Sequence, residues 1–405
     1  MKIIQGNFSD NVKGFKTAGI AVGFKKSGKK DLAMIYSESN AVSAATFTKN
    51  KAKAAPVLIN MEYIKNDITK AVVINSGQAN ACTGEKGYED ALQIAKLTAK
   101  ELNLKPEEVL QASTGVIGIP IPMDKMENGI KDITKMLSYT GGEAASTAIM
   151  TTDIVKKVVS VNIELNGKKV GISGMAKGSG MIHPNMATML SFVVTDANIS
   201  KDMLNKILKD SIEDSYNMIS VDGDTSTNDM VIALANGMAE NLVIDNENKE
   251  FLIIKEAFDY VNKELAKKIA RDGEGATKLF QTKVIGANNE SDAKKCAKSV
   301  VSSNLVKCAM FGSDANWGRV ICALGYSDAD FDPYKVDLHF ESSAGKVQVA
   351  EKGMMIAYDE EKAKAVLDED TITVLVNLNS GESEAIAWGC DLTYKYVEIN
   401  GEYRT

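Results

Sequence analysis

The chain has 405 residues, 44% of them hydrophobic and 25% charged, an ordinary composition for a soluble globular protein with two or three structural units. The net charge of −7 is modest and mixed, the N-terminus lacks the apolar core of a signal peptide, and no apolar run reaches membrane-spanning length, so we expect a cytoplasmic protein that binds neither nucleic acid nor membrane. Its five cysteines are scattered and form no CxxC pair, which indicates reduced thiols rather than a zinc site or a disulfide framework.

In the first third of the chain, strand and helix patterns alternate. Residues 70–74 (KAVVI) predict a short buried strand that ends in a turn at residues 75–77. Apolar residues recur at helical spacing over residues 92–102, which predicts a helix with one buried face. Residues 109–112 are mostly apolar and stop at Ser113-Thr114-Gly115, which we interpret as a second strand followed by a turn.

The rest of the chain combines antiparallel pairs with further helices. Residues 158–165 and 169–175 flank Asn166-Gly167, a dipeptide favoured in two-residue hairpins. Ser200 can cap a helix, a longer helical pattern covers residues 254–269, and the last hundred residues are mostly strand-like. The fold class is therefore α/β (α+β) with mixed and antiparallel sheets, not a string of separate domains.

Two loops resemble ligand-binding motifs, but each lacks a residue that the motif requires. GFKKSGKK (residues 23–30) has phosphate-loop spacing, but Lys30 stands where Ser or Thr holds magnesium, so we interpret it as a charged turn. DGDTSTND (residues 222–229) begins like a calcium loop, but Thr227 replaces the required glycine and Ala233 the required glutamate. Its polar side chains are better suited to ordering a turn by bonding the backbone.

Histidine, the usual general base, is scarce in this chain. His183 and His339 are far apart, have no metal-ligand spacing, and no GxSxG motif accompanies them. A threonine at a chain's N-terminus carries its own base instead, because its α-amine has a pKa of about 7.7–8.0. An internal threonine gains such an amine only if the preceding peptide bond is cut.

One junction in the sequence suits such a cut. KGSGMIHPNMATMLSFVVTD (residues 177–196) passes from a glycine-rich stretch into a buried-strand pattern through Ala187-Thr188. The glycines permit a strained backbone, the small Ala187 precedes the threonine, and a strand would hold the Thr188 hydroxyl in place. The alternative interpretation is a surface loop followed by an ordinary strand threonine.

Seven motifs, taken together and in order along nearly the whole chain, resemble the ornithine acetyltransferase family, the glutamate N-acetyltransferases of the cyclic arginine pathway. They are FTKNKAKAAPV (47–57), NSGQANACTG (75–84), STGVIG (113–118), GMAKGSGMIHPNMATML (174–190), SVDGDTSTND (220–229), DGEGATK (272–278) and FGSDANWGR (311–319).

The resemblance implies a self-cleaving enzyme with sheets sandwiched by helices. Cleavage between Ala187 and Thr188 would give an α-chain of residues 1–187 and a β-chain of residues 188–405, intertwined in one globular unit. Thr188 would be the nucleophile that passes an acetyl group from N-acetylornithine to glutamate. Thr114 and Gly115 would form the oxyanion hole, which suits our expectation of free backbone N–H groups where a strand ends. Two α- and two β-chains would assemble into a heterotetramer without metal or cofactor, and acetyl-CoA as a second acetyl donor is left open.

The substrate-binding residues implied by the resemblance are Thr151, Lys177, Thr188, Glu274, Asn400 and Thr405. Lys177 is the natural partner for a substrate carboxylate, and Glu274 for the ornithine ammonium. Asn400-Gly401 looks like a hairpin turn without a returning strand, near a chain end that would close over substrate. Two alternatives remain: a self-processing amidase or aminopeptidase, and an uncleaved protein that binds amino acids without catalysis.

Overall fold

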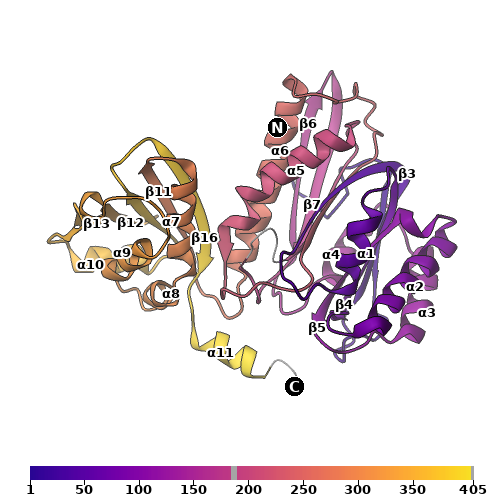
Figure 1. The fold of residues 1–405 in the computed structure, drawn as a ribbon, viewed down its shortest axis with the longest axis horizontal. Coiled ribbons are helices and arrows are strands. Elements are labelled where there is room, and N and C mark those ends of the chain that lie inside the picture. Colours follow the sequence, from indigo (N-terminus) through magenta and orange to yellow (C-terminus); the bar gives the residue numbers. More distant parts are fainter. Residues whose placement is uncertain (184–188, 403–405) are drawn as a thin grey trace. The chain divides into compact units, whose positions relative to one another are not determined.

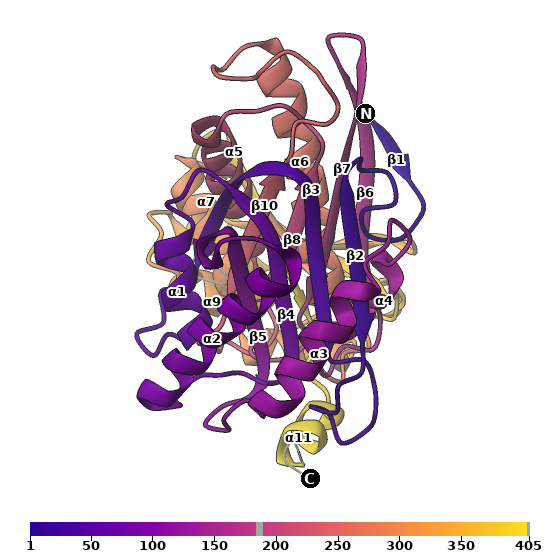
Figure 2. The same ribbon diagram turned by 90° about the vertical axis from the view of Figure 1, so that its right-hand side faces the viewer.

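The computed structural model describes residues 1–183 and 189–402, and Figures 1 and 2 show its elements from two directions. These residues form two compact units, which we describe separately. The first unit contains the described parts of Met1–Gly178, Pro184–Asn217 and Thr225–Leu265, and the second those of Ser179–His183, Met218–Asp224 and Ala266–Thr405.

The first unit is built on a large mixed sheet. Its strands are β1 (Lys2–Ile4), β2 (Phe15–Ile20), β3 (Leu32–Phe47), β4 (Thr69–Gln78), β5 (Val109–Val116), β6 (Lys157–Leu165), β7 (Lys168–Lys177), β8 (Leu190–Thr195) and β10 (Met230–Ala235). Its helices are α1 (Ala55–Tyr63), α2 (Gly84–Leu102), α3 (Met123–Lys135), α4 (Gly142–Ala148), α5 (Lys201–Glu213) and most of α6 (Lys249–Arg271), with short 3₁₀ turns at Pro106–Glu108 and Tyr216–Met218.

The strands of this sheet follow the order β1-β6-β7-β8-β10-β3-β4-β5, and β2 also pairs with β3. Two pairs are parallel, β8 with β10 and β4 with β5, and the others are antiparallel. Every residue of β8 and β10 is buried, as expected for strands in the middle of a sheet. In the described part of the sheet, β5 is an edge strand with β4 as its single neighbour.

Side chains along β3 and β4 point alternately to the two faces of the sheet, so the apolar core lies in two layers. Met34 and Val73 pack with Ile94 of α2 and Ile130 of α3 in one cluster. Ile74 and its neighbours on the opposite face belong to a second cluster. Figure 2 shows α2 and α3 in front of the strands that they cover. This arrangement follows from the period of two in a strand, which sends successive side chains to opposite faces.

Several predicted local elements are confirmed. Asn166 and Gly167 have φ values of 51° and 73° and join β6 to β7, as a two-residue hairpin requires. The Ser200 hydroxyl accepts a hydrogen bond from the Met203 N–H at 3.3 Å and caps α5. The helical pattern of residues 254–269 lies within α6 and buries its apolar side chains.

The two predicted turns at residues 75–77 and 113–115 were wrong, because both segments continue as strand. Asn75, Ser76 and Gly77 of β4 pair in parallel with Ser113, Thr114 and Gly115 of β5. The small residues in this part of the strand pair let the two backbones approach closely. A Cβ atom added to Gly115 would lie 2.3 Å from the carbonyl carbon of Gly77. Pairing across the sheet therefore outweighs the turn preference of the isolated tripeptides.

The second unit has its own seven-stranded sheet among the described residues, in the order β14-β13-β12-β15-β11-β16-β9. Its strands are β9 (Ile219–Ser220), β11 (Leu279–Ala287), β12 (Asp337–Ser342), β13 (Gly345–Glu351), β14 (Met354–Met355), β15 (Thr371–Asn377) and β16 (Ser383–Cys390). Its helices are the end of α6, α7 (Glu290–Ser302), α8 (Asn304–Phe311), α9 (Trp317–Gly325), α10 (Glu360–Leu367) and α11 (Tyr394–Gly401), with a 3₁₀ turn at Pro333–Lys335.

The expectation of a mostly strand-like last hundred residues was wrong in part, because α9, α10 and α11 occupy much of that stretch. In the same way, Asn400 and Gly401 close α11 rather than a hairpin. Thr393 explains this helix: its hydroxyl accepts from the Lys395 N–H and donates to the Gly275 carbonyl, which caps the helix and ties it to the chain after α6. Across residues 1–183 and 189–402, no helix combines the length and apolarity needed to span a bilayer.

Candidate active site

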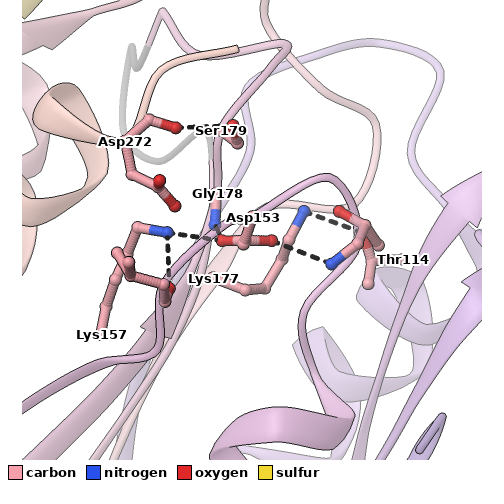
Figure 3. A network of polar contacts seen from close by, with 9 residues as sticks. Thr114, Asp153, Lys157, Lys177, Gly178, Ser179 and Asp272 are labelled. Atoms are coloured by element: carbon pink, nitrogen blue, oxygen red, sulfur yellow. Dashed lines mark hydrogen bonds and ion pairs between the residues drawn. The ribbon is translucent and has the colours of Figure 1, made fainter. Parts of the chain in front are cut away.

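In the first unit, the end of β7 lies against the end of β5. Lys177, the last residue of β7, extends its ammonium to 3.4 Å from the Thr114 hydroxyl oxygen (Figure 3). Lys177 is buried and Thr114 half-buried. An ammonium can only donate, so the Thr114 hydroxyl accepts from it and keeps its own proton to give to another acceptor. This hydrogen bond therefore joins two residues that are 63 positions apart in the sequence.

The hydrogen bonds around β5 determine which backbone groups face its open edge. The Val116 carbonyl accepts from the Ala79 N–H on the β4 side at 3.0 Å. Because N–H and C=O groups alternate in direction along a strand, Thr114 also faces β4, whereas Gly115 faces the open edge. The expected free N–H therefore applies to Gly115 and not to Thr114, whose hydroxyl is the group available to a ligand.

Gly115 is the residue that this geometry requires. Its φ of 128° lies in a region that side chains disfavour, and any Cβ would clash with Gly77, whose own φ is 125°. The two glycines are level with each other in the parallel pair β4–β5. The close approach of the Gly115 and Gly77 backbones thus fixes the position of the Gly115 N–H, and a residue with a side chain at position 115 would prevent this approach.

Asp153 is a buried carboxylate that ties residues 151–157 to Gly178, the residue after Lys177 (Figure 3). Its Oδ1 accepts from the Lys157 ammonium and from the Gly178 N–H, each at 2.7 Å, and its Oδ2 accepts from the Thr151 N–H at 2.9 Å. Both side chains of the Asp153–Lys157 ion pair are fully buried. Burial opposes ionisation, but the charges of Lys177 and Lys157 and the Gly178 bond outweigh it, so the pKa of Asp153 is held well below its usual value.

A second carboxyl group, that of Asp229, has the opposite electrostatic setting. It is buried just before β10, and its Oδ2 has no hydrogen-bond partner within residues 1–183 and 189–402. Burial raises the pKa of Asp229 well above the usual value, although hydrogen bonding to Ser226 and the charge of Lys177 act against that rise. The pKa values of the two carboxyl groups are thus shifted in opposite directions, Asp153 downward and Asp229 upward.

In the second unit, the structure brings together two of the residues that the resemblance assigns to substrate. The Asn400 amide donates to Oε2 of Glu274 at 2.8 Å, across 126 positions of sequence. Glu274 lies just beyond α6, and its N–H donates to the Ser179 carbonyl. Gly180 makes room for the Glu274 carboxylate, because an added Cβ would lie 2.3 Å from it.

The same unit holds Asp222 and the two residues after it, which begin the DGDTSTND segment. The Asp222 carboxylate accepts from the Asp224 N–H at 3.3 Å, which confirms the expected side chain-to-backbone bond within this turn. It also accepts from the Met181 and Ile182 N–H groups at 2.6 and 2.8 Å. His183 contacts the Ser220 hydroxyl at 3.0 Å. Burial and the nearby charges of two lysines lower the pKa of His183 to about 4, so it is neutral at pH 7.

Three of the candidate residues, Ala187, Thr188 and Thr405, lie outside the described residues. Thr151 contributes its backbone N–H to Asp153. The roles assigned to Thr114, Gly115, Lys177, Glu274 and Asn400 stay predictions, although the structure places the first three near one another and the last two in contact.

Sequence reasoning missed Asp153, Asp229 and Asn228. Asp153 stands in a segment beside the exposed Ile154, so nothing local marks it as buried. Asp229 and Asn228 end the DGDTSTND loop, and that polar run was the available signal. In the described part of the chain, no group of three or more His, Cys, Asp or Glu residues has the arrangement of a metal site.

Comparison with known proteins identifies close relatives. The ArgJ family model matches residues 16–405. The arginine biosynthesis bifunctional protein ArgJ 1 of Clostridium acetobutylicum is 56% identical over 405 residues, covering 100% of this chain and 99% of the relative. The bifunctional protein ArgJ of Caldanaerobacter subterraneus subsp. tengcongensis is 54% identical and is covered in full, as is this chain. The crystal structure of ArgJ from Bacillus halodurans superposes with a TM-score of 0.50 at 44% identity, covering 53% of this chain and 99% of that one.

Proposed function

The chain belongs to the ArgJ family of arginine-biosynthesis enzymes, and from this premise we propose that it moves an acetyl group from N-acetylornithine to glutamate through an acetyl-Thr188 intermediate. It matures by cleaving itself between Ala187 and Thr188, works in the cytoplasm as a heterotetramer of two α- and two β-chains, and needs no cofactor. Acetyl-CoA is a candidate second donor, in keeping with the word "bifunctional" in the names of its relatives.

The observation that carries this proposal is the cluster of Lys177, Thr114 and Gly115. It combines a buried cation, a hydroxyl group that can donate, and a backbone N–H at a strand edge. Donors of this kind stabilise the oxyanion that forms when a nucleophile attacks an acyl carbon, and each is typically worth about 3–4 kcal/mol. The cation suits a substrate that carries a carboxylate.

In the proposed reaction, the Thr188 α-amine takes the proton of the Thr188 hydroxyl as Oγ attacks the acetyl carbon of N-acetylornithine. Negative charge develops on the acetyl oxygen and is stabilised by the Thr114 hydroxyl and the Gly115 N–H. The C–N bond then breaks, and the α-ammonium returns its proton to the departing ornithine amine. Glutamate attacks the acetyl ester in the reverse sequence and leaves as N-acetylglutamate.

Glu274 and Asn400 supply discrimination between the two substrates. The Glu274 carboxylate is buried and can pair with the side-chain ammonium of ornithine, while the Asn400 amide that donates to it fixes its orientation. A general amidase would have no use for a buried carboxylate at this place. Recognition of a charged amino acid therefore favours transfer between amino acids over peptide hydrolysis.

Two observations favour maturation into residues 1–187 and 188–405. β7 and β8 are antiparallel neighbours, with Lys177 level with Leu190, so a cut between them would leave both strands held in one sheet. The crystal chain of the Bacillus halodurans relative aligns over nearly its whole length with about half of this one. A cut near the middle of the chain would produce fragments of that size.

Initial-rate kinetics tests the proposal. Because the acetyl group would rest on Thr188, ornithine leaves before glutamate enters, and double-reciprocal plots at several glutamate concentrations should be parallel. With N-acetylornithine alone, mass spectrometry should find the acetyl group on the peptide that begins at Thr188, and glutamate should remove it. Intersecting lines without a trapped acetyl-enzyme would overturn the proposed mechanism. Replacing N-acetylornithine by acetyl-CoA in the same assay tests the second donor.

A further inference from the structure

Beside the proposed oxyanion hole, the open edge of β5 is covered by two buried asparagine side chains. Asn60 of α1 binds Gln111: its amide donates to the Gln111 carbonyl at 2.7 Å and accepts from the Gln111 N–H at 3.0 Å. Asn228 binds the next edge-facing residue, donating to the Ser113 carbonyl at 2.8 Å. Gly115 is the edge-facing residue that follows.

The amide of Asn228 has a fixed orientation. Its Nδ2 donates to two carbonyls, those of Ser113 and Ala79, at 2.8 and 2.5 Å, and its Oδ1 accepts from the Thr227 hydroxyl at 2.7 Å. The side chain is buried, and both amide protons are used. Ala79 follows β4 directly, so Asn228 joins the end of β4 to β5. These bonds lie next to the point where Gly77 and Gly115 are level with each other in the two strands.

This contact has a chemical consequence for Gly115. The Ser113 carbonyl and the Gly115 N–H face the same edge of β5, because residues two apart in a strand point the same way. A carbonyl without a donor would direct its negative end toward the region where an oxyanion forms. Donation from Asn228 offsets that negative charge and holds the two-residue segment that ends at the Gly115 N–H.

We infer that Asn228 is a positioning residue for the oxyanion hole, acting through the Ser113 carbonyl on the Gly115 N–H. The inference rests on the proposed acetyl transfer and on the assignment of Gly115 to the oxyanion. Asn228 itself touches no reacting atom. Its effect should therefore appear in the rate of the chemical step rather than in substrate binding.

The test compares Asn228→Ala with Asn60→Ala, which removes an equally buried amide from the same strand but leaves the Ser113 carbonyl bound. Acetyl transfer from N-acetylornithine to glutamate is measured per competent site, with sites counted from the acetyl-enzyme burst and folding followed by the melting temperature. We expect Asn228→Ala to lower kcat about tenfold and change KM less than about twofold. Asn60→Ala should keep kcat within about threefold, even with an equal loss of melting temperature.

A milder variant keeps the test decisive if Asn228→Ala does not fold. Thr227→Val retains Asn228 but removes the hydroxyl that fixes its Oδ1, and we expect kcat to fall about threefold. Equal losses of kcat in the two alanine variants, or a wild-type kcat in Thr227→Val, would overturn the inference and leave the proposed function standing. A wild-type enzyme without acetyl transfer would overturn both.

Discussion

The variant Asp153→Asn removes one charge from an ion pair that water cannot reach. The Lys157 ammonium would lose the carboxylate that lies 2.7 Å from it, and both side chains of this pair are fully buried. Breaking such a pair by removing one partner costs about 3–5 kcal/mol. For a unit of this size, each kcal/mol corresponds to about 2–4 °C, so the melting temperature should fall by about 6–20 °C.

A double-mutant cycle with Lys157→Met separates the charge effect from the lost hydrogen bonds. The double variant lacks both charges of the buried pair, so it should be about 2 kcal/mol more stable than Asp153→Asn in urea denaturation. Glu127→Gln serves as the control, because Glu127 and Lys131 form an exposed pair at the same four-residue spacing and should leave the midpoint unchanged. A loss below about 1 kcal/mol in Asp153→Asn, or no recovery in the double variant, would refute this reasoning.

Four further predictions concern the other candidate residues and Asp153. Because the pKa of Asp153 is depressed, its contribution to stability is present above about pH 4 and is lost as pH falls below it; acid unfolding should be less steep in Asp153→Asn than in wild type. Gly115→Ala should abolish acetyl transfer and destabilise the protein, because its Cβ cannot coexist with the Gly77 backbone; normal kinetics would contradict the edge geometry. Glu274→Gln should raise KM for N-acetylornithine about tenfold or more and change KM for glutamate little, since one charge-assisted contact is worth about 1.5–3 kcal/mol; equal effects on both substrates would exclude recognition of the ornithine ammonium. Thr188→Ala should remain one chain on a denaturing gel where wild type gives two, and cleavage of this variant would exclude Thr188 as the agent.

Local signals predicted the elements whose cause is itself local. Asn166-Gly167 adopts positive φ at both residues, and Ser200 caps α5 within three residues of itself. The face of α6 repeats every three to four residues, so its burial could be predicted without knowing what covers it. In each case the residues that determine the structure lie within one or two turns of each other.

The residues that build the site depend on partners far away in the sequence. Ser113-Thr114-Gly115 has the composition of a turn, and becomes strand because β4 lies alongside with a glycine at the level of Gly115. Asn228 appears in the sequence as one more polar residue of a loop, while its two carbonyl partners are 149 and 115 positions away. Motif spacing could place these residues in a family, but the hydrogen bonds that orient them arise only from the sheet.

The two carboxyl groups near Lys177 affect the positive charge that the proposed site offers to a substrate carboxylate. Lys177 interacts electrostatically with both Asp153 and Asp229. The Asp153 carboxylate is paired with Lys157, and burial of Asp229 disfavours its charged form, so both features favour a net positive charge at Lys177. If Asp229 were ionised as well, this set of groups would be neutral and would no longer favour a carboxylate. If Lys177 binds the substrate carboxylate as proposed, burial of Asp229 also favours binding, because it disfavours a second carboxylate that would compete for Lys177.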